Sequence, residues 1–275
     1  MSRFRHTTQP FAGVDGRALT LELWQPAQPS AAALPTLLLL DGQWLHEVID
    51  ETLAASAGPP LLVASLGFSS AEREVIRPWR ARDYTPRAPG PGQCDPRVPQ
   101  WPCGGADTLL GLIGDRLLPQ LVAGHRADPD RCALFGHSYA GLFATFAWLQ
   151  QPTPFARIYA ASPSLWWYWP HMQALASDAL AAPRTQALPP LQLFVGDEER
   201  WRPTPAQADQ TRPPGIPTLD FARQFLAGLA SDAAARTTLQ VVPGFAHGPM
   251  LAWSARHCLR AFAASVAQAV DPGQP

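Results

Sequence analysis

The stretch Gly136-His137-Ser138-Tyr139-Ala140-Gly141 decides the fold of this chain. It follows the apolar run 132–135, which is typical of a buried strand, and it precedes 142–149, which has the composition of a buried helix. A strand, a sharp turn of small residues carrying a serine, and a helix together form a nucleophile elbow. Such a turn holds the serine hydroxyl at the end of the strand and at the positive end of the helix dipole. The pattern predicts Ser138 as the nucleophile of a hydrolase.

The elbow departs from the general pattern G-x-S-x-G at one position. Ala140 occupies the last place, and the glycine comes one residue later, at Gly141. Alanine is still small enough for the turn. A pentapeptide of this kind also occurs as an ordinary turn without chemistry, so the flanking strand and helix carry the prediction.

Composition narrows the classes of function. Of 275 residues only 16% are charged, and the formal net charge is −1. A nucleic-acid-binding face or an anionic membrane surface would call for a basic protein, so neither partner is expected. No apolar run approaches the roughly 20 residues of a membrane span. The segment 1–8 is positively charged without an apolar stretch behind it, which predicts a cytoplasmic protein without a signal peptide and leaves the periplasm as an alternative.

The four cysteines do not have the C-x-x-C spacing of a structural zinc site, and we expect no metal and no cofactor. Cys94 and Cys103 bracket a proline-rich loop and would be able to pair in an exported protein. Cys132 and Cys258 fall in a predicted strand and a predicted helix, where free buried cysteine is ordinary.

Buried strands alternate with helices along the chain. The pattern predicts strands at 19–24, 35–41, 61–66, 132–135, 157–161, 191–196 and 239–242, and helices at 45–57, 107–121, 142–149, 219–229 and 250–270. This order is typical of a mostly parallel central sheet with helices on both faces, the α/β-hydrolase fold. We expect one domain over 1–275 with irregular insertions near 68–105 and 198–218.

A serine hydroxyl needs a base beside it. His247 follows the last predicted strand, and in α/β hydrolases the chain order is serine, acid, histidine. His257 lies within the predicted last helix and is expected to be structural, whereas His137 points the wrong way to act on its neighbour. The acid is expected in the loop 197–199, where Asp197, Glu198 and Glu199 are adjacent. Spacing alone does not choose among them, and a Ser–His dyad without an acid stays open.

An oxyanion hole needs two backbone N–H groups. One is expected from the residue after the nucleophile, Tyr139. The other is expected from the loop after the strand 35–41, where Gln43 is the predicted donor. Because only the backbone takes part, the side chains give little guidance.

Four separated motifs together resemble one protein family. They are Leu40-Asp41-Gly42-Gln43, Arg82-Asp83-Tyr84-Thr85-Pro86, the elbow followed by Ser162-Pro163-Ser164-Leu165-Trp166-Trp167, and Pro243-Gly244-Phe245-Ala246-His247-Gly248. Their order and spacing resemble the putative esterase (esterase D-like) family of α/β hydrolases over nearly the whole chain. The R-D-Y-T-P and S-P-S-L-W-W segments look most like the branch that hydrolyses enterobactin-type siderophore trilactones.

The resemblance implies a serine carboxylesterase that opens catecholate triesters and so releases iron, which would arrive as part of the substrate. It implies Ser138 as nucleophile and His247 as base, and the family habit of G-x-x-[DE] favours Glu199 as acid. It also implies that the segment with Arg80 and Arg82 lines the substrate site. Two departures weaken the substrate assignment: Ala140, and the proline-rich stretch 200–217 beside the site.

The residues themselves suggest an aromatic and cationic substrate surface. Trp166 and Trp167 follow the end of a predicted strand and would wall a cleft, while Arg80 and Arg82 would meet an anionic ferric catecholate. Packing of a loop on the sheet edge and ordinary surface solvation explain the same residues equally well. A general esterase acting on feruloyl, acetyl or S-formylglutathione substrates, and a non-catalytic catecholate-binding protein, are the alternatives.

Overall fold

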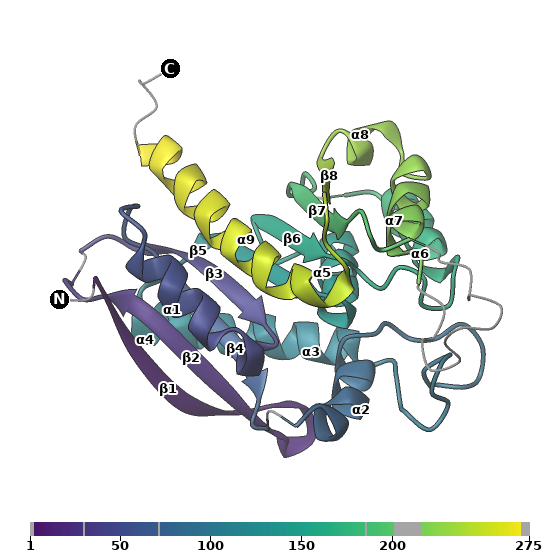
Figure 1. Cartoon of the computed structure of the whole chain (residues 1–275), viewed down its shortest axis with the longest axis horizontal. Helices are drawn as coiled ribbons and strands as arrows, with labels where there is room; N and C mark the ends of the chain where they lie inside the picture. Colours follow the sequence, from purple (N-terminus) through teal and green to yellow (C-terminus); the bar gives the residue numbers. More distant parts are fainter. Residues whose placement is uncertain (1–2, 30, 71, 185, 201–215, 271–275) are drawn as a thin grey trace.

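A single twisted sheet organises the chain in the computed structural model, which describes residues 3–29, 31–70, 72–184, 186–200 and 216–270 (Figure 1). Its eight strands lie in the order β1-β2-β4-β3-β5-β6-β7-β8. The strands are β1 (Phe4–Ala12), β2 (Ala18–Pro26), β3 (Leu34–Leu40), β4 (Leu62–Phe68), β5 (Ala127–His137), β6 (Arg157–Ala161), β7 (Leu191–Gly196) and β8 (Thr237–Val242). β1 pairs with β2, and β2 with β4, in antiparallel register, whereas every later pair is parallel.

Helices cover both faces of this sheet. They are α1 (His46–Ala54), α2 (Arg73–Asp83), α3 (Ala106–Leu112), α4 (Leu118–His125), α5 (Tyr139–Leu149), α6 (His171–Ala181), α7 (Thr218–Ala227), α8 (Ser231–Ala234) and α9 (His247–Val270). Short 3₁₀ turns stand at Val14–Gly16 and Gly42–Trp44, and a π-helical stretch at Ile113–Leu117 joins α3 to α4.

The sheet separates two hydrophobic cores, and strand β3 shows how. All seven of its residues are buried, with Leu37 and Leu39 in one core and Leu38 and Leu40 in the other. Successive side chains of a strand point to opposite faces, so an uninterrupted apolar run serves both cores. Helices α1 and α9 contribute to the first core and lie side by side (Figure 1). The predicted fold class is confirmed.

Several elements differ from the sequence predictions. The stretch expected to be irregular from 68 to 105 contains α2, and its first residue belongs to β4. Pro78 and six charged residues interrupt the apolar period of α2, which hid the helix. Strand β1 and helix α6 were not predicted, and the helix expected from 250 begins at His247. Most of the second expected insertion, 201–215, lies outside the described residues, and α7 begins at Thr218 within its range.

No helix in the part of the chain that the structure describes combines the length and apolar character needed to cross a bilayer.

Candidate active site

Ser138 stands at the junction between β5 and α5 in a strained backbone conformation. Its φ of 62° and ψ of −118° lie outside the regions that L-residues usually adopt. The two flanking glycines make this turn feasible: a Cβ atom on Gly136 would lie 2.0 Å from the carbonyl oxygen of Ala140, and one on Gly141 would lie 2.7 Å from that of Ala161. Close backbone approach therefore requires glycine at 136 and 141, while position 140 accepts an alanine.

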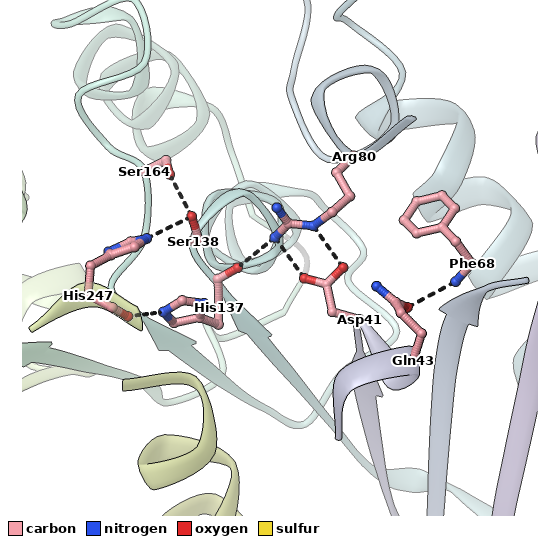
Figure 2. A network of polar contacts seen from close by, with 8 residues as sticks. All are labelled: Asp41, Gln43, Phe68, Arg80, His137, Ser138, Ser164 and His247. Carbon is pink, nitrogen blue, oxygen red and sulfur yellow. Dashed lines mark hydrogen bonds and ion pairs between the residues drawn. The ribbon is translucent and has the colours of Figure 1, made fainter. Parts of the chain in front are cut away.

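His247 lies next to the serine, as the first residue of α9 (Figure 2). Its Nε2 atom is 3.0 Å from Ser138 Oγ. The hydroxyl of Ser164 lies 3.5 Å from the same Oγ, at the limit of a hydrogen bond. The geometry allows the imidazole to take the hydroxyl proton directly.

Glu199 completes a hydrogen-bonded chain behind the imidazole. Its Oε2 atom lies 2.6 Å from His247 Nδ1. Its Oε1 atom accepts hydrogen bonds from Ser162 Oγ at 2.5 Å and from the backbone N–H of Gly196 at 3.0 Å. The carboxylate side chain is only 1% exposed, so these donors replace the water that a charged group loses on burial. The nearby carboxylate of Asp197 accepts a hydrogen bond from the backbone N–H of Gly244 and not from His247.

His137 lies beneath the base rather than beside the nucleophile. Its Nε2 atom donates to the main-chain carbonyl of His247 at 3.0 Å, and the two rings lie 4.8 Å apart. Burial, followed by the charges of His247 and Arg80, holds the pKa of His137 well below its usual range. A neutral His137 at this place fixes the backbone of His247 through its hydrogen bond to the carbonyl.

The two predicted oxyanion donors both stand at helix starts. Tyr139 is the first residue of α5, and Gln43 lies in the 3₁₀ turn after β3, where Asp41 adopts the left-handed region with φ of 62°. The first N–H groups of a helix have no partner within it. The side-chain Oε1 of Gln43 accepts the N–H of Phe68 at 3.0 Å and so ties its turn to the end of β4 (Figure 2).

Arg80 joins that turn to the elbow. Its Nε and Nη2 atoms donate to the two carboxylate oxygens of Asp41 at 2.9 and 2.8 Å, and Nη2 lies 3.4 Å from the carbonyl oxygen of His137 (Figure 2). The Arg80 side chain is 11% exposed and the Asp41 side chain is 1% exposed. Although burial acts in the opposite direction, the Asp41 charge raises the pKa of Arg80. This arginine is engaged as a structural partner of the loop that carries Gln43.

The other predicted substrate residues are dispersed. Arg82 pairs with Asp15 at the turn between β1 and β2, away from the elbow. Trp167 is fully buried in a core, so it does not form a cleft wall. Trp166 is half-buried and does lie near the nucleophile, since its ring is 5.9 Å from that of Tyr139.

Arg97 is the cation that the sequence analysis missed at this place. Its guanidinium carbon lies 4.0 Å from the centre of the Trp166 ring, and its Nη2 donates to Tyr139 Oη at 3.0 Å. The Tyr139 hydroxyl in turn donates to Asp95. Arg97 is exposed, and it belongs to a proline-rich stretch with no periodic pattern, so no local signal marked it.

Cys94 and Cys103 are free thiols in this structure. Their segments approach through an isolated bridge between Cys94 and Pro102, and burial raises the pKa of Cys103 to about 11. The thiol form of Cys103 is therefore the stable one near neutral pH.

Comparison with known proteins agrees with this arrangement. The family model "Putative esterase" matches residues 15–203. The "Apo-salmochelin esterase" of Escherichia coli O6:H1 is 29% identical over 234 residues, which cover 83% of this chain and 69% of that protein. The "Siderophore enterobactin esterase" of Emericella nidulans is 32% identical over 193 residues, covering 62% of this chain and 60% of the relative.

Solved structures show the same fold. The enterobactin hydrolase IroE in complex with DFP superposes with a TM-score of 0.72 at 25% identity over 96% of both chains. The siderophore hydrolase EstB from Aspergillus nidulans superposes with a TM-score of 0.76 at 22% identity over 94% of both chains. The predicted family resemblance is confirmed: this chain is an ester hydrolase and belongs to the putative esterase family.

Proposed function

We propose that the chain is a serine carboxylesterase that hydrolyses siderophore-type esters, of the catecholate trilactone class, through an acyl-enzyme. The hydrogen-bonded chain from Ser138 through His247 to Glu199 carries the chemical part of this proposal. The names of the relatives, which include esterases of salmochelin and of enterobactin, support the substrate class.

The first half of the reaction forms the acyl-enzyme. Ser138 Oγ attacks the ester carbonyl carbon while His247 Nε2 takes the hydroxyl proton, and Glu199 stabilises the imidazolium that results. The negative charge that develops on the carbonyl oxygen is met by the N–H groups of Tyr139 and Gln43. Collapse of the tetrahedral intermediate breaks the ester C–O bond, and His247 returns its proton to the departing alkoxide oxygen.

The second half releases the acid product. Water attacks the acyl carbon and gives a proton to His247 Nε2, and a second tetrahedral intermediate forms on the same two N–H groups. When it collapses, the proton passes from the imidazole to Ser138 Oγ, so that the free enzyme is restored. A trilactone would pass through this cycle once for each ester bond and yield linear trimer, dimer and monomer in turn.

Arg97 and Trp166 form the proposed recognition surface, with the guanidinium stacked on the indole beside Tyr139. An exposed cation on an aromatic platform suits a substrate that is both aromatic and anionic. Arg80 and Arg82 are occupied by carboxylates and take no direct part in this proposal.

Hydrolysis of an enterobactin-like trilactone, iron-free and iron-loaded, tests the function when products are followed by mass spectrometry. Stepwise linear products from the wild type, absent with Ser138→Ala, are expected. Cleavage of a simple aryl butyrate with no cleavage of either trilactone would keep the esterase and overturn the substrate class. Recovery of intact trilactone tightly bound to a protein inactive on both esters would instead identify a binding protein.

A further inference from the structure

A cluster of three metal-ligating side chains lies on the antiparallel edge of the sheet, apart from the triad. Glu22 stands on β2, His6 stands on β1 diagonally opposite it on the same face, and His46 begins α1. Glu22 Oε1 lies 2.8 Å from His46 Nδ1 and 3.3 Å from His6 Nε2. All three ligand atoms lie within 4.8 Å of one another.

We propose that His6 Nε2, His46 Nδ1 and Glu22 Oε1 bind a divalent transition metal ion, for which Zn²⁺ is the probe. Tetrahedral zinc with bonds of about 2.0–2.1 Å needs ligand atoms roughly 3.3 Å apart. The separations of 2.8 and 3.3 Å from Glu22 Oε1 are close to that value and the third pair lies within 4.8 Å, so small side-chain rotations would bring the three atoms to bonding distance. Two imidazoles and one carboxylate form a donor set that zinc accepts readily.

The surroundings of His46 argue for a cation between the three ligands. Its second ring nitrogen, Nε2, lies 3.4 Å from Asp50 Oδ2. Asp50 is therefore placed to accept the Nε2 proton of a His46 ring whose Nδ1 atom binds a metal. The present 2.8 Å contact of Nδ1 with Glu22 Oε1 is a hydrogen bond, which a bound metal ion would replace. Carboxylates that orient the far nitrogen of a ligating histidine in this way are a regular feature of metal sites.

Trp24 holds this arrangement in place from below. It is 1% exposed, and its ring lies 4.6 Å from that of His6 and 5.6 Å from that of His46. Its Nε1 donates to Asp50 Oδ1 at 2.5 Å, which fixes the carboxylate behind His46. The hydroxyl of Thr8 also lies 3.5 Å from His6 Nε2 and would turn toward solvent when a metal binds. The ligands thus rest on a rigid buried support.

A hollow borders two of the three proposed ligands. This hollow of about 370 Å³ has Glu22 and His46 on its wall, together with Gln43 of the turn that precedes α1. It gives water or a small anion access to a metal at this place. None of the triad residues belongs to the cluster, although the hollow also borders the turn that carries the proposed oxyanion donor Gln43.

Zinc binding to the full chain tests the proposal, with metal first removed by a chelator and Zn²⁺ then titrated against a chromophoric competitor. One equivalent is expected for the wild type, with affinity at least about 100-fold weaker in Glu22→Gln and in His6→Asn. Asp50→Asn should weaken binding about 10- to 100-fold, because it removes only the orienting carboxylate. The double variant C94S/C103S serves as the control and should bind like the wild type.

Substitution by Co²⁺ supplies a second readout, because a site of nitrogen and oxygen ligands gives no sulfur-to-metal charge-transfer band. Zinc should also raise the unfolding temperature of the wild type but not that of a folded Glu22→Gln protein. Absence of zinc binding, unchanged affinity in both Glu22→Gln and His6→Asn, or loss of binding only in the cysteine variant would each overturn the proposal.

Discussion

The Nε2 atom of His137 lies 3.0 Å from the main-chain carbonyl oxygen of His247 and donates to it. The residue before the proposed nucleophile therefore anchors the backbone of the residue proposed as its base. Two loops more than a hundred positions apart in the chain meet through this bond, which makes the spacing between Ser138 and His247 a property of the folded core.

This anchor predicts a pH dependence of stability. Burial keeps the pKa of His137 well below its usual range, whereas in the unfolded chain the imidazole takes up a proton near its ordinary pKa of about 6.5. Between those two values the unfolded state binds more protons, so the free energy of unfolding falls as the pH falls below about 6.5. His137→Asn should reduce this slope by up to about 1.4 kcal/mol per pH unit.

Urea unfolding of both proteins at several pH values from 7.5 to about 5 measures this difference. His257, whose pKa is also lowered by burial, is present in both proteins and cancels in the comparison. At pH 7.5 the variant should be less stable by about 1 kcal/mol, because the bond to the carbonyl is lost. Parallel curves for the two proteins would contradict the prediction.

The elbow predicts losses of stability of very different size for two exchanges between glycine and alanine. Gly136→Ala would place a methyl group 2.0 Å from the carbonyl oxygen of Ala140, so we expect a loss of at least about 3 kcal/mol of stability. Ala140→Gly restores the general pattern and should cost only about 1 kcal/mol while activity is kept. Thermal unfolding and aryl butyrate hydrolysis check both, and equal effects of the two exchanges would refute the steric argument.

Local patterns explain what could be predicted from the sequence. The elbow and the position of His247 follow from short-range signals, namely a strand, a turn and the order of the motifs along the chain. The acid did not, because three adjacent carboxylates carry the same local signal. In the structure Glu199 differs from Asp197 because it accepts a hydrogen bond from Ser162, which follows β6 and becomes adjacent only in the fold, and another from Gly196 at the end of its own strand, β7.

The sequence assigned Arg80 and Arg82 a shared role at the substrate site, and the structure separates them for a geometric reason. Arg80 and Arg82 lie two residues apart on α2, and positions two apart on a helix point in nearly opposite directions. One side chain therefore faces Asp41 and the elbow, while the other faces Asp15 at the sheet edge. An expectation of irregular structure over this segment gave no basis for separating them. The adjacent Trp166 and Trp167 diverge similarly, one partly exposed and one buried.

The buried pair of Asp41 and Arg80 predicts a large effect from a small change. Asp41→Asn keeps the shape and suits the left-handed backbone at this position, but it leaves a buried guanidinium without its counter-charge. We expect a loss of about 3–5 kcal/mol of stability. Glu74→Gln removes the partner of Arg77 in an exposed pair and should change stability by less than about 0.5 kcal/mol. Similar losses in chemical denaturation of the two variants would contradict this account.

The substitution Glu199→Gln measures how much the proposed acid contributes to kcat. An amide can donate to His247 Nδ1, which forces the proton onto Nε2 and leaves no acceptor for the Ser138 hydroxyl. We expect kcat to fall about 10³- to 10⁴-fold. Asp197→Asn is the matched control and should stay within a few-fold of the wild type, because that carboxylate faces the Gly244 N–H.

The combination with Ser138→Ala sharpens that prediction. Residues that act as one unit are not additive, so the double variant Ser138→Ala/Glu199→Gln should be no slower than Ser138→Ala alone. Initial rates on an aryl butyrate give all three values. A further fall in the double variant, or an unchanged kcat in Glu199→Gln, would mean that the carboxylate acts independently or that a Ser–His dyad is sufficient.

Arg97 predicts a specific change in substrate preference. Its guanidinium lies on the Trp166 ring and contacts the Tyr139 hydroxyl, and the side chain is exposed, so its charge is available to a ligand. Arg97→Gln should lower kcat/KM for an anionic catecholate ester about tenfold through KM, and leave that for a neutral aryl butyrate within about twofold. Arg82→Gln, whose native partner is Asp15, should alter neither. An equal loss of kcat/KM on both esters with Arg97→Gln would mean that this side chain supports the fold of the site. A loss of kcat/KM only on the anionic ester with Arg82→Gln would place the recognition surface at the β1–β2 turn.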